Sequence, residues 1–200
     1  MSDLKSSFMD YEDAIWAELW ASVGGVHLNE EGWRQDKLMV EHGPWIITLE
    51  FHTHGGYRTQ ATYTRFRVAF ENPEKFHFKV APQGLLDSVG KLLGLQDVEL
   101  GDTDFDKTFL VKSNNEARVR EVLDDAVLRN FLREEPEAVI ALISVVGDRA
   151  KEFPEGVDEV VMEIPGKVVD VDRLKRLYMT FSRTLSGLCE SGAAYETRGA

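Results

Sequence analysis

The sequence predicts one α+β domain, with an antiparallel or mixed sheet of about six strands and helices packed mainly on one face. Apolar residues recur at every second position between residues 45 and 81, which is the period of a strand with one buried side. At both ends of the chain and in its middle they recur at helical spacing instead. With 200 residues, 43% of them hydrophobic, the chain can bury one full-sized core. We expect this domain to span residues 26–190.

The first expected element is an N-terminal amphipathic helix within residues 1–25. It carries Trp16 and Trp20 on its apolar side, and Gly24 and Gly25 follow as a C-terminal stop signal. Tryptophans at helical spacing dock either on the core of their own domain or on a partner protein, and both interpretations stay open here.

Three alternating segments follow at residues 45–54, 59–71 and 76–80. Gly55-Gly56 and Asn72-Pro73 supply turn residues between them. We therefore expect three consecutive strands joined by short connections, forming an antiparallel meander with one buried and one solvated face.

The middle of the chain predicts helices again. A short apolar stripe lies at residues 85–93, followed by an acidic loop at 96–106 and a strand at 108–112. A longer helix is expected from residue 116 to about 133, with Val127 among the residues of its inward face.

The C-terminal third predicts two strands and a helix. Residues 138–146 are nearly all apolar and predict a central strand covered on both faces, and a second strand is expected at 159–164. Asp170 is placed to cap the last helix, and residues 191–200 lack periodicity and predict a loose C-terminal tail.

Charge and composition exclude several classes of protein. The chain has 35 acidic and 23 basic residues, a net charge of −12, which repels phosphate backbones and argues against a nucleic acid partner. It contains no run of about 18 apolar residues, so we expect no membrane span. Its one cysteine, Cys189, cannot form an internal disulfide, and we expect a buried, structural thiol and a cytoplasmic location.

One motif carries a resemblance to a known family. Residues 94–109 follow the pattern Gly-x-Gln-Asp-[Ile/Val]-x-[Ile/Leu]-Gly-Asp-x-x-Phe-Asp-x-x-Phe, from Gln96 to Phe109 at its core, and Tyr63-Thr64-Arg65 precedes it. The pattern resembles that of an uncharacterised bacterial protein family. Its Phe-Asp-x-x-Phe-x-Val part, from Phe105 to Val111, also resembles the motif of a domain of unknown function, some of whose members are membrane-tethered. The resemblance implies a shared fold over residues 45–190 and implies no reaction.

The acidic part of this motif has two interpretations. Asp102, Asp104 and Asp106 alternate as in a calcium loop, but Lys107 and Ser113 stand where an EF-hand requires glycine and glutamate. The favoured interpretation is a structural turn whose carboxylates accept hydrogen bonds from backbone amides. A looser divalent metal site shared with other segments is the alternative.

A second metal hypothesis rests on histidines. His52 and His54 lie on one side of the first alternating strand, about 7 Å apart at their Cα atoms. Zinc sites use such pairs when a third ligand arrives from elsewhere, and Asp102 or Asp106 could supply it. The alternative is that both histidines are solvent-exposed polar residues.

The second alternating strand predicts a basic face made by Tyr63, Arg65 and Arg67. In an acidic chain these arginines either pair with the chain's own carboxylates or hold an anionic ligand or an acidic partner segment.

The sequence contains no phosphate-binding loop, dinucleotide fingerprint, nucleophile elbow or zinc-protease helix, and we expect no cofactor. The leading hypothesis is therefore a non-enzymatic module that binds a protein partner, a second copy of itself or a small anionic ligand. Its candidate surfaces are the Tyr63/Arg65/Arg67 face and the helix with Trp16 and Trp20. The alternatives are a metal-dependent enzyme at the histidine and aspartate positions, and a carrier of an apolar ligand in a cup between sheet and helices.

Overall fold

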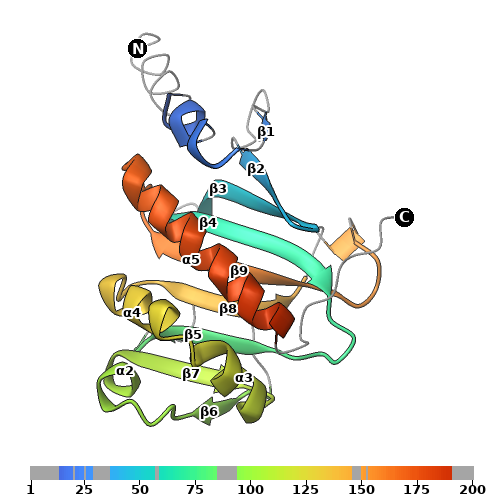
Figure 1. The fold of residues 1–200 in the computed structure, drawn as a ribbon, viewed down its shortest axis with the longest axis vertical. Coiled ribbons are helices and arrows are strands. Elements are labelled where there is room, and N and C mark those ends of the chain that lie inside the picture. Colours follow the sequence, from blue (N-terminus) through green and yellow to red (C-terminus); the bar gives the residue numbers. More distant parts are fainter. Residues whose placement is uncertain are drawn as a thin grey trace.

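The computed structural model describes residues 14–19, 21–24, 26–28, 37–56, 59–84, 94–145, 150–151 and 153–190. Its centre is a nine-stranded antiparallel sheet in the order β1-β2-β3-β4-β9-β8-β5-β7-β6, crossed by helices α3, α4 and α5 (Figure 1). The α+β class is confirmed, and the sheet is larger than the six strands expected from the sequence.

The strands are β1 (Val26–Leu28), β2 (Lys37–His42), β3 (Trp45–Gly56), β4 (Thr59–Glu71), β5 (Phe78–Pro82), β6 (Gln96–Val98), β7 (Phe109–Ser113), β8 (Val139–Ser144) and β9 (Val157–Pro165). The helices are α2 (Thr103–Thr108), α3 (Glu116–Leu123), α4 (Ala126–Glu134) and α5 (Val171–Glu190), preceded by a helical segment at residues 14–19 and 21–23. None of the described helices is both long enough and apolar enough to cross a membrane.

The expected meander is wrong in its third strand. The consecutive neighbours are β2, β3 and β4, whereas β5 pairs with β7 and β8. The place beside β4 is taken by β9, so the C-terminal hairpin β8–β9 is inserted between β4 and β5. Alternation predicts that a segment is a strand, but it carries no information about which strand lies next to it.

The glycines expected to form a turn are strand residues. Gly55 and Gly56 belong to β3 and pair with Gln60 and Thr59 of β4. The acidic loop expected at residues 96–106 likewise contains regular structure, because it includes β6 and the first residues of α2.

The helix expected at residues 116–133 is two helices, α3 and α4. Asp125 Oδ1 accepts hydrogen bonds from the amides of Val127, at 2.8 Å, and Leu128, at 3.3 Å, so a new helix begins there. The break changes which residues face inward. Val127, expected in the core, is 58% exposed.

The C-terminal elements are confirmed. The two expected strands are β8 and β9, and α5 begins where the sequence predicts, with Asp170 Oδ1 accepting a 2.6 Å hydrogen bond from the Arg173 amide. The expected helix at residues 85–93 and the tail at 191–200 lie outside the described residues.

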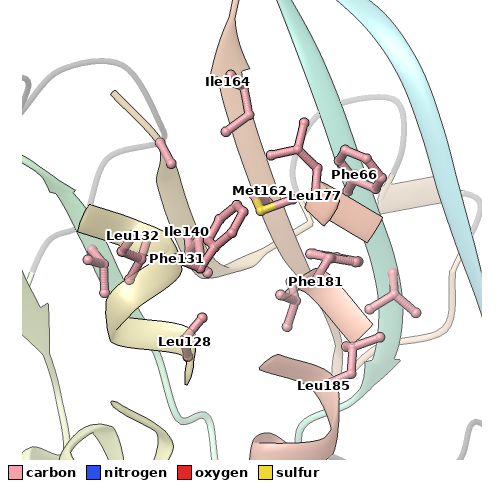
Figure 2. Packing of buried hydrophobic residues seen from close by; sticks show 14 of the residues in the cluster. Phe66, Leu128, Phe131, Leu132, Ile140, Met162, Ile164, Leu177, Phe181 and Leu185 are labelled. Atoms are coloured by element: carbon pink, nitrogen blue, oxygen red, sulfur yellow. The ribbon is translucent and has the colours of Figure 1, made fainter. Parts of the chain in front are cut away.

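A continuous apolar core fills the space between the sheet and the helices. Figure 2 shows Phe66 of β4 and Met162 of β9 packed against Phe181 of α5, with Ile140 of β8 beside Phe131 of α4. The rings of Phe66 and Phe181 lie 5.9 Å apart between centroids. Side chains therefore occupy the region where the sequence had suggested a cup for an apolar ligand.

The opposite side of the central strands is also buried, which differs from the solvated face expected. The buried polar residues there alternate with core residues along their strands: Glu50, Arg67, Lys79, Glu159 and Glu163 are each between 2% and 8% exposed. A polar strand pattern thus does not indicate solvent exposure in the middle of a wide sheet.

Candidate functional site

The predicted basic face of β4 is an ionic ladder across three strands. Arg67 holds Glu50 of β3 through two contacts, Nη2 to Oε2 at 3.1 Å and Nε to Oε1 at 3.0 Å. On its other side, Arg67 Nη1 lies 3.4 Å from Glu159 Oε1 of β9. Arg65 Nε donates a 2.7 Å hydrogen bond to Glu163 Oε1, also of β9.

This ladder decides between the two interpretations of the basic face. The side chains of Arg65 and Arg67 are 15% and 9% exposed, and their partners come from the strands on either side. The arginines thus pair with the chain's own carboxylates and are not presented to an external anion. Tyr63, on the same side of β4, is half-buried and has a bridge partner in Gly166.

The N-terminal helix is docked on the chain's own core where the structure describes it. Trp16 has no exposed surface and its ring lies 4.8 Å from that of Phe51, with Ile15 and Leu19 buried beside it. Trp16 is therefore not a partner surface. Trp20 lies outside the described residues.

The candidate metal ligands are not brought together. His52 lies on β3, five strands from β7 and its neighbour α2, which corresponds to roughly 24 Å at the usual strand spacing. His54 belongs to β3, but its side chain lies outside the described residues. Within the described ranges, no group of three His, Cys, Asp or Glu residues is arranged to hold a metal ion.

The aspartates of the motif act in local structure. Asp102 caps α2 by accepting a hydrogen bond from the Phe105 amide, and this bond, with the Arg133 ion pair, places the pKa of Asp102 below its ordinary value. Asp106 accepts from the amides of Leu100 and Gly101, each at 3.0 Å. Both carboxylates are thus satisfied by the turn itself, as the favoured interpretation predicted.

Cys189 is poorly suited to nucleophilic chemistry. Its thiol donates a 2.8 Å hydrogen bond to the Leu185 carbonyl, and partial burial raises its pKa to about 11. Because the thiolate is the reactive form, this cysteine is protonated and unreactive near neutral pH.

A groove of about 930 Å³ lies where the junction of α3 and α4 meets α5. We call it the α3–α5 groove; its lining residues are Glu121, Val122, Asp124, Asp125, Ala126, Val127, Leu128, Met179, Thr180, Ser182, Arg183, Ser186, Gly187 and Glu190. Two of them, Val127 and Met179, are 58% and 69% exposed. Both side chains therefore offer apolar contact area at the same groove.

The groove is also acidic. Four carboxylates and one cation, Arg183, line it. Arg183 is ion-paired with Asp125. Partial burial raises the pKa of Asp125, but hydrogen bonds from Arg183 and from two backbone amides outweigh that effect, so this pKa lies below its ordinary value. Asp124 is ion-paired in turn with Arg129, at 3.8 Å, so the negative potential of the groove comes mainly from Glu121 and Glu190.

The groove is not evident from the sequence pattern. Val127 was assigned to a buried face because the two helices follow one apolar pattern across their break. The available signal was Asp124-Asp125 followed by an apolar run, which is a helix start. Met179 lies outside the apolar stripe of α5, so its exposure could have been predicted from the spacing.

No protein family model, curated protein or solved structure matches this chain in comparisons of sequence and structure. The resemblance based on residues 94–109 therefore stays a prediction.

Proposed function

We propose that this chain is a non-enzymatic binding module whose α3–α5 groove receives a basic amphipathic segment of a partner protein. The observation that carries the proposal is the combination of exposed Val127 and Met179 with acidic Glu121, Asp124 and Glu190 at one hollow. An amphipathic helix offers apolar anchors at helical spacing and Lys or Arg beside them, which complements this surface.

The shape of the groove, like its charge, suits the side chains of an amphipathic helix. Small residues of α5, namely Ser182, Ser186 and Gly187, are among its lining residues. A Cβ added at Gly187 would lie 3.8 Å from the Val122 carbonyl oxygen, so α3 and α5 approach closely at the groove. This close packing favours a partner that inserts side chains over one that requires the helices to separate.

Fluorescence anisotropy with a labelled model peptide tests the proposal. The peptide is a helix-forming 14-residue sequence with leucine on one face and lysine on the other, compared with a version in which glutamate replaces every lysine. We expect the lysine peptide to bind and the glutamate peptide to bind at least about tenfold more weakly, because like charges are then opposed.

Two pairs of variants locate the binding. Met179→Ser and Val127→Ser remove the apolar anchors, and Val169→Ser and Ile46→Ser are the matched controls, since these residues are 39% and 50% exposed but lie outside the groove. We expect about a tenfold loss of affinity for each groove variant and no change for the controls. Equal affinities across all four variants would contradict the proposal.

The charge contribution is separable. Glu121→Gln with Glu190→Gln should weaken binding and reduce its dependence on salt, whereas Glu134→Gln on the exposed side of α4 should change neither.

Sedimentation of the unliganded protein tests whether the occupant of the groove is a second copy of this chain. A dimer that Met179→Ser dissociates would make the occupant a second copy and overturn the assignment to a partner protein.

A further inference from the structure

A second cavity, of about 680 Å³, lies at the ends of β8 and β9, away from the α3–α5 groove. His77 is among the residues that line it. The backbone of His77 is held on both sides by Asn114, through 2.9 Å and 3.2 Å hydrogen bonds, and its carbonyl also accepts from Ser113. The imidazole therefore projects from a fixed point.

The ring of His77 is held through one nitrogen. Nε2 lies 2.9 Å from Asp158 Oδ2, and this carboxylate, 7% exposed, also accepts a 2.6 Å hydrogen bond from Asn72. Asn72 is 2% exposed and forms hydrogen bonds with both the amide and the carbonyl of Phe76. The side chain that holds Asp158 is therefore itself fixed. This is a built arrangement of buried polar residues.

The same geometry excludes a serine nucleophile. Ser144 Oγ lies 3.2 Å from Nε2, the nitrogen that Asp158 already holds. In a Ser-His-Asp triad the carboxylate and the serine occupy different ring nitrogens, so that the base can take the hydroxyl proton. His77 thus does not activate Ser144.

The second ring nitrogen of His77, Nδ1, can act as a hydrogen-bond acceptor. In the neutral imidazole, an Nε2–H that donates to Asp158 leaves the lone pair on Nδ1 as the remaining acceptor of the ring. No hydrogen bond of Nδ1 is found among the described residues, and the His77 side chain is 21% exposed. A molecule in the cavity that carries an N–H or O–H donor can therefore bind to this nitrogen.

Charges of both signs lie around this acceptor. Lys75 and Glu155 line the same cavity, and both are exposed. Lys75 is the one described non-glycine residue with a left-handed backbone, φ 50°, and Asn114 Nδ2 fixes that turn by donating to its carbonyl at 2.6 Å. A simple anion would meet Glu155 and Asp158, and a simple cation would meet Lys75.

We propose that this cavity binds a small zwitterion with an apolar body, such as a free amino acid with an apolar side chain. Its ammonium donates to His77 Nδ1 near Glu155, and its carboxylate pairs with Lys75. The apolar body lies against Val145 and Phe153, which line the remaining wall. The proposal is independent of the α3–α5 groove.

Three ligands that share one body test it. L-phenylalanine carries both charged groups, 2-phenylethylamine lacks the carboxylate, and 3-phenylpropanoate lacks the ammonium. We expect L-phenylalanine to shift the backbone amide resonances of residues 75–77 and 153–158 in NMR titrations, and each analogue to bind about tenfold more weakly, the equivalent of one charge-assisted contact.

Matched variants assign the contacts. His77→Gln keeps an amide group for Asp158 but removes the Nδ1 acceptor, and Lys75→Gln removes the cation. We expect each to weaken L-phenylalanine binding about tenfold, with His42→Gln and Lys107→Gln as unaffected controls. If His77→Gln proves unfolded by its amide spectrum, Lys75→Gln and the ligand series still decide. Equal affinity for all three ligands, or no shift at millimolar L-phenylalanine, would overturn the proposal.

Discussion

The two sides of the central strands are both buried, and they are buried by different means. Phe66 and Arg67 are successive residues of β4 and are 0% and 8% exposed. Phe66 faces the helices and packs against Phe181, whereas Arg67 faces away from them and contacts Glu50 and Glu159. One strand thus contributes an apolar contact and an ionic contact at adjacent positions.

The difference between the two sides is one of specificity. Apolar packing has no direction, so many arrangements of strands would bury Phe66. The ladder of Arg67 requires a carboxylate from β3 and another from β9, at one register. A slip of one residue would turn every one of these side chains to the wrong face. We therefore infer that the apolar side contributes most of the stability and that the ionic side selects strand order and register.

The largest effect is expected on the apolar side. Phe181→Ala removes a fully buried ring from the centre of the core shown in Figure 2, and it should lower the free energy of unfolding by about 4 kcal/mol. Urea denaturation measures this value. A loss below about 1 kcal/mol would mean that α5 does not hold the sheet.

A somewhat smaller effect is expected on the ionic side. Arg67→Met leaves Glu50 and Glu159 buried without this cation and should cost about 3 kcal/mol. The double change Glu50→Leu with Arg67→Met removes both charges of the main pair, so we expect it to recover most of the loss. Additive costs in the two single variants and the double variant would show that the ladder residues do not act as a pair.

Much of the fold follows from patterns in the sequence. The parts that could not be predicted depend on contacts between residues far apart in the chain. The strand at β4 and its two faces follow from alternation. The insertion of β9 beside β4 depends on contacts between residues about 100 positions apart, such as Arg65 with Glu163, which no local pattern reveals. The candidate sites were missed for the same reason. His77 meets Asp158 only after β5, β8 and β9 are assembled, and the α3–α5 groove exists only because Asp125 ends one helix and starts another.

The ion pair of Asp125 with Arg183 lies at the surface, where ion pairs contribute less to the free energy of unfolding than the buried pairs of Arg67 do. Asp125→Ala removes the α4 cap and the Arg183 contact, and it should lower the free energy of unfolding by about 1 kcal/mol. Asp125→Asn, which keeps the cap, should cost less. A loss as large as that of Arg67→Met would remove the distinction between buried and surface ion pairs.

The two capping aspartates predict a weak pH dependence. The pKa values of Asp102 and Asp125 lie below the ordinary 3.8, so their stabilising effect is present above that pH and is lost as the pH falls through the lowered values. Urea midpoints measured between pH 5 and pH 2 should therefore decline less steeply for the Asp102→Asn/Asp125→Asn double variant than for the parent chain. Parallel curves would show that these carboxylates do not contribute to the acid sensitivity.

The central functional claim is that the α3–α5 groove binds a basic amphipathic segment. The most direct measurement is an amide NMR map of the lysine and leucine peptide on the full chain. We expect the shifts to concentrate on α4 and on the exposed side of α5 around Met179, and we expect Met179→Ser to remove them. Shifts spread evenly over the acidic surface, or unchanged by Met179→Ser, would contradict it.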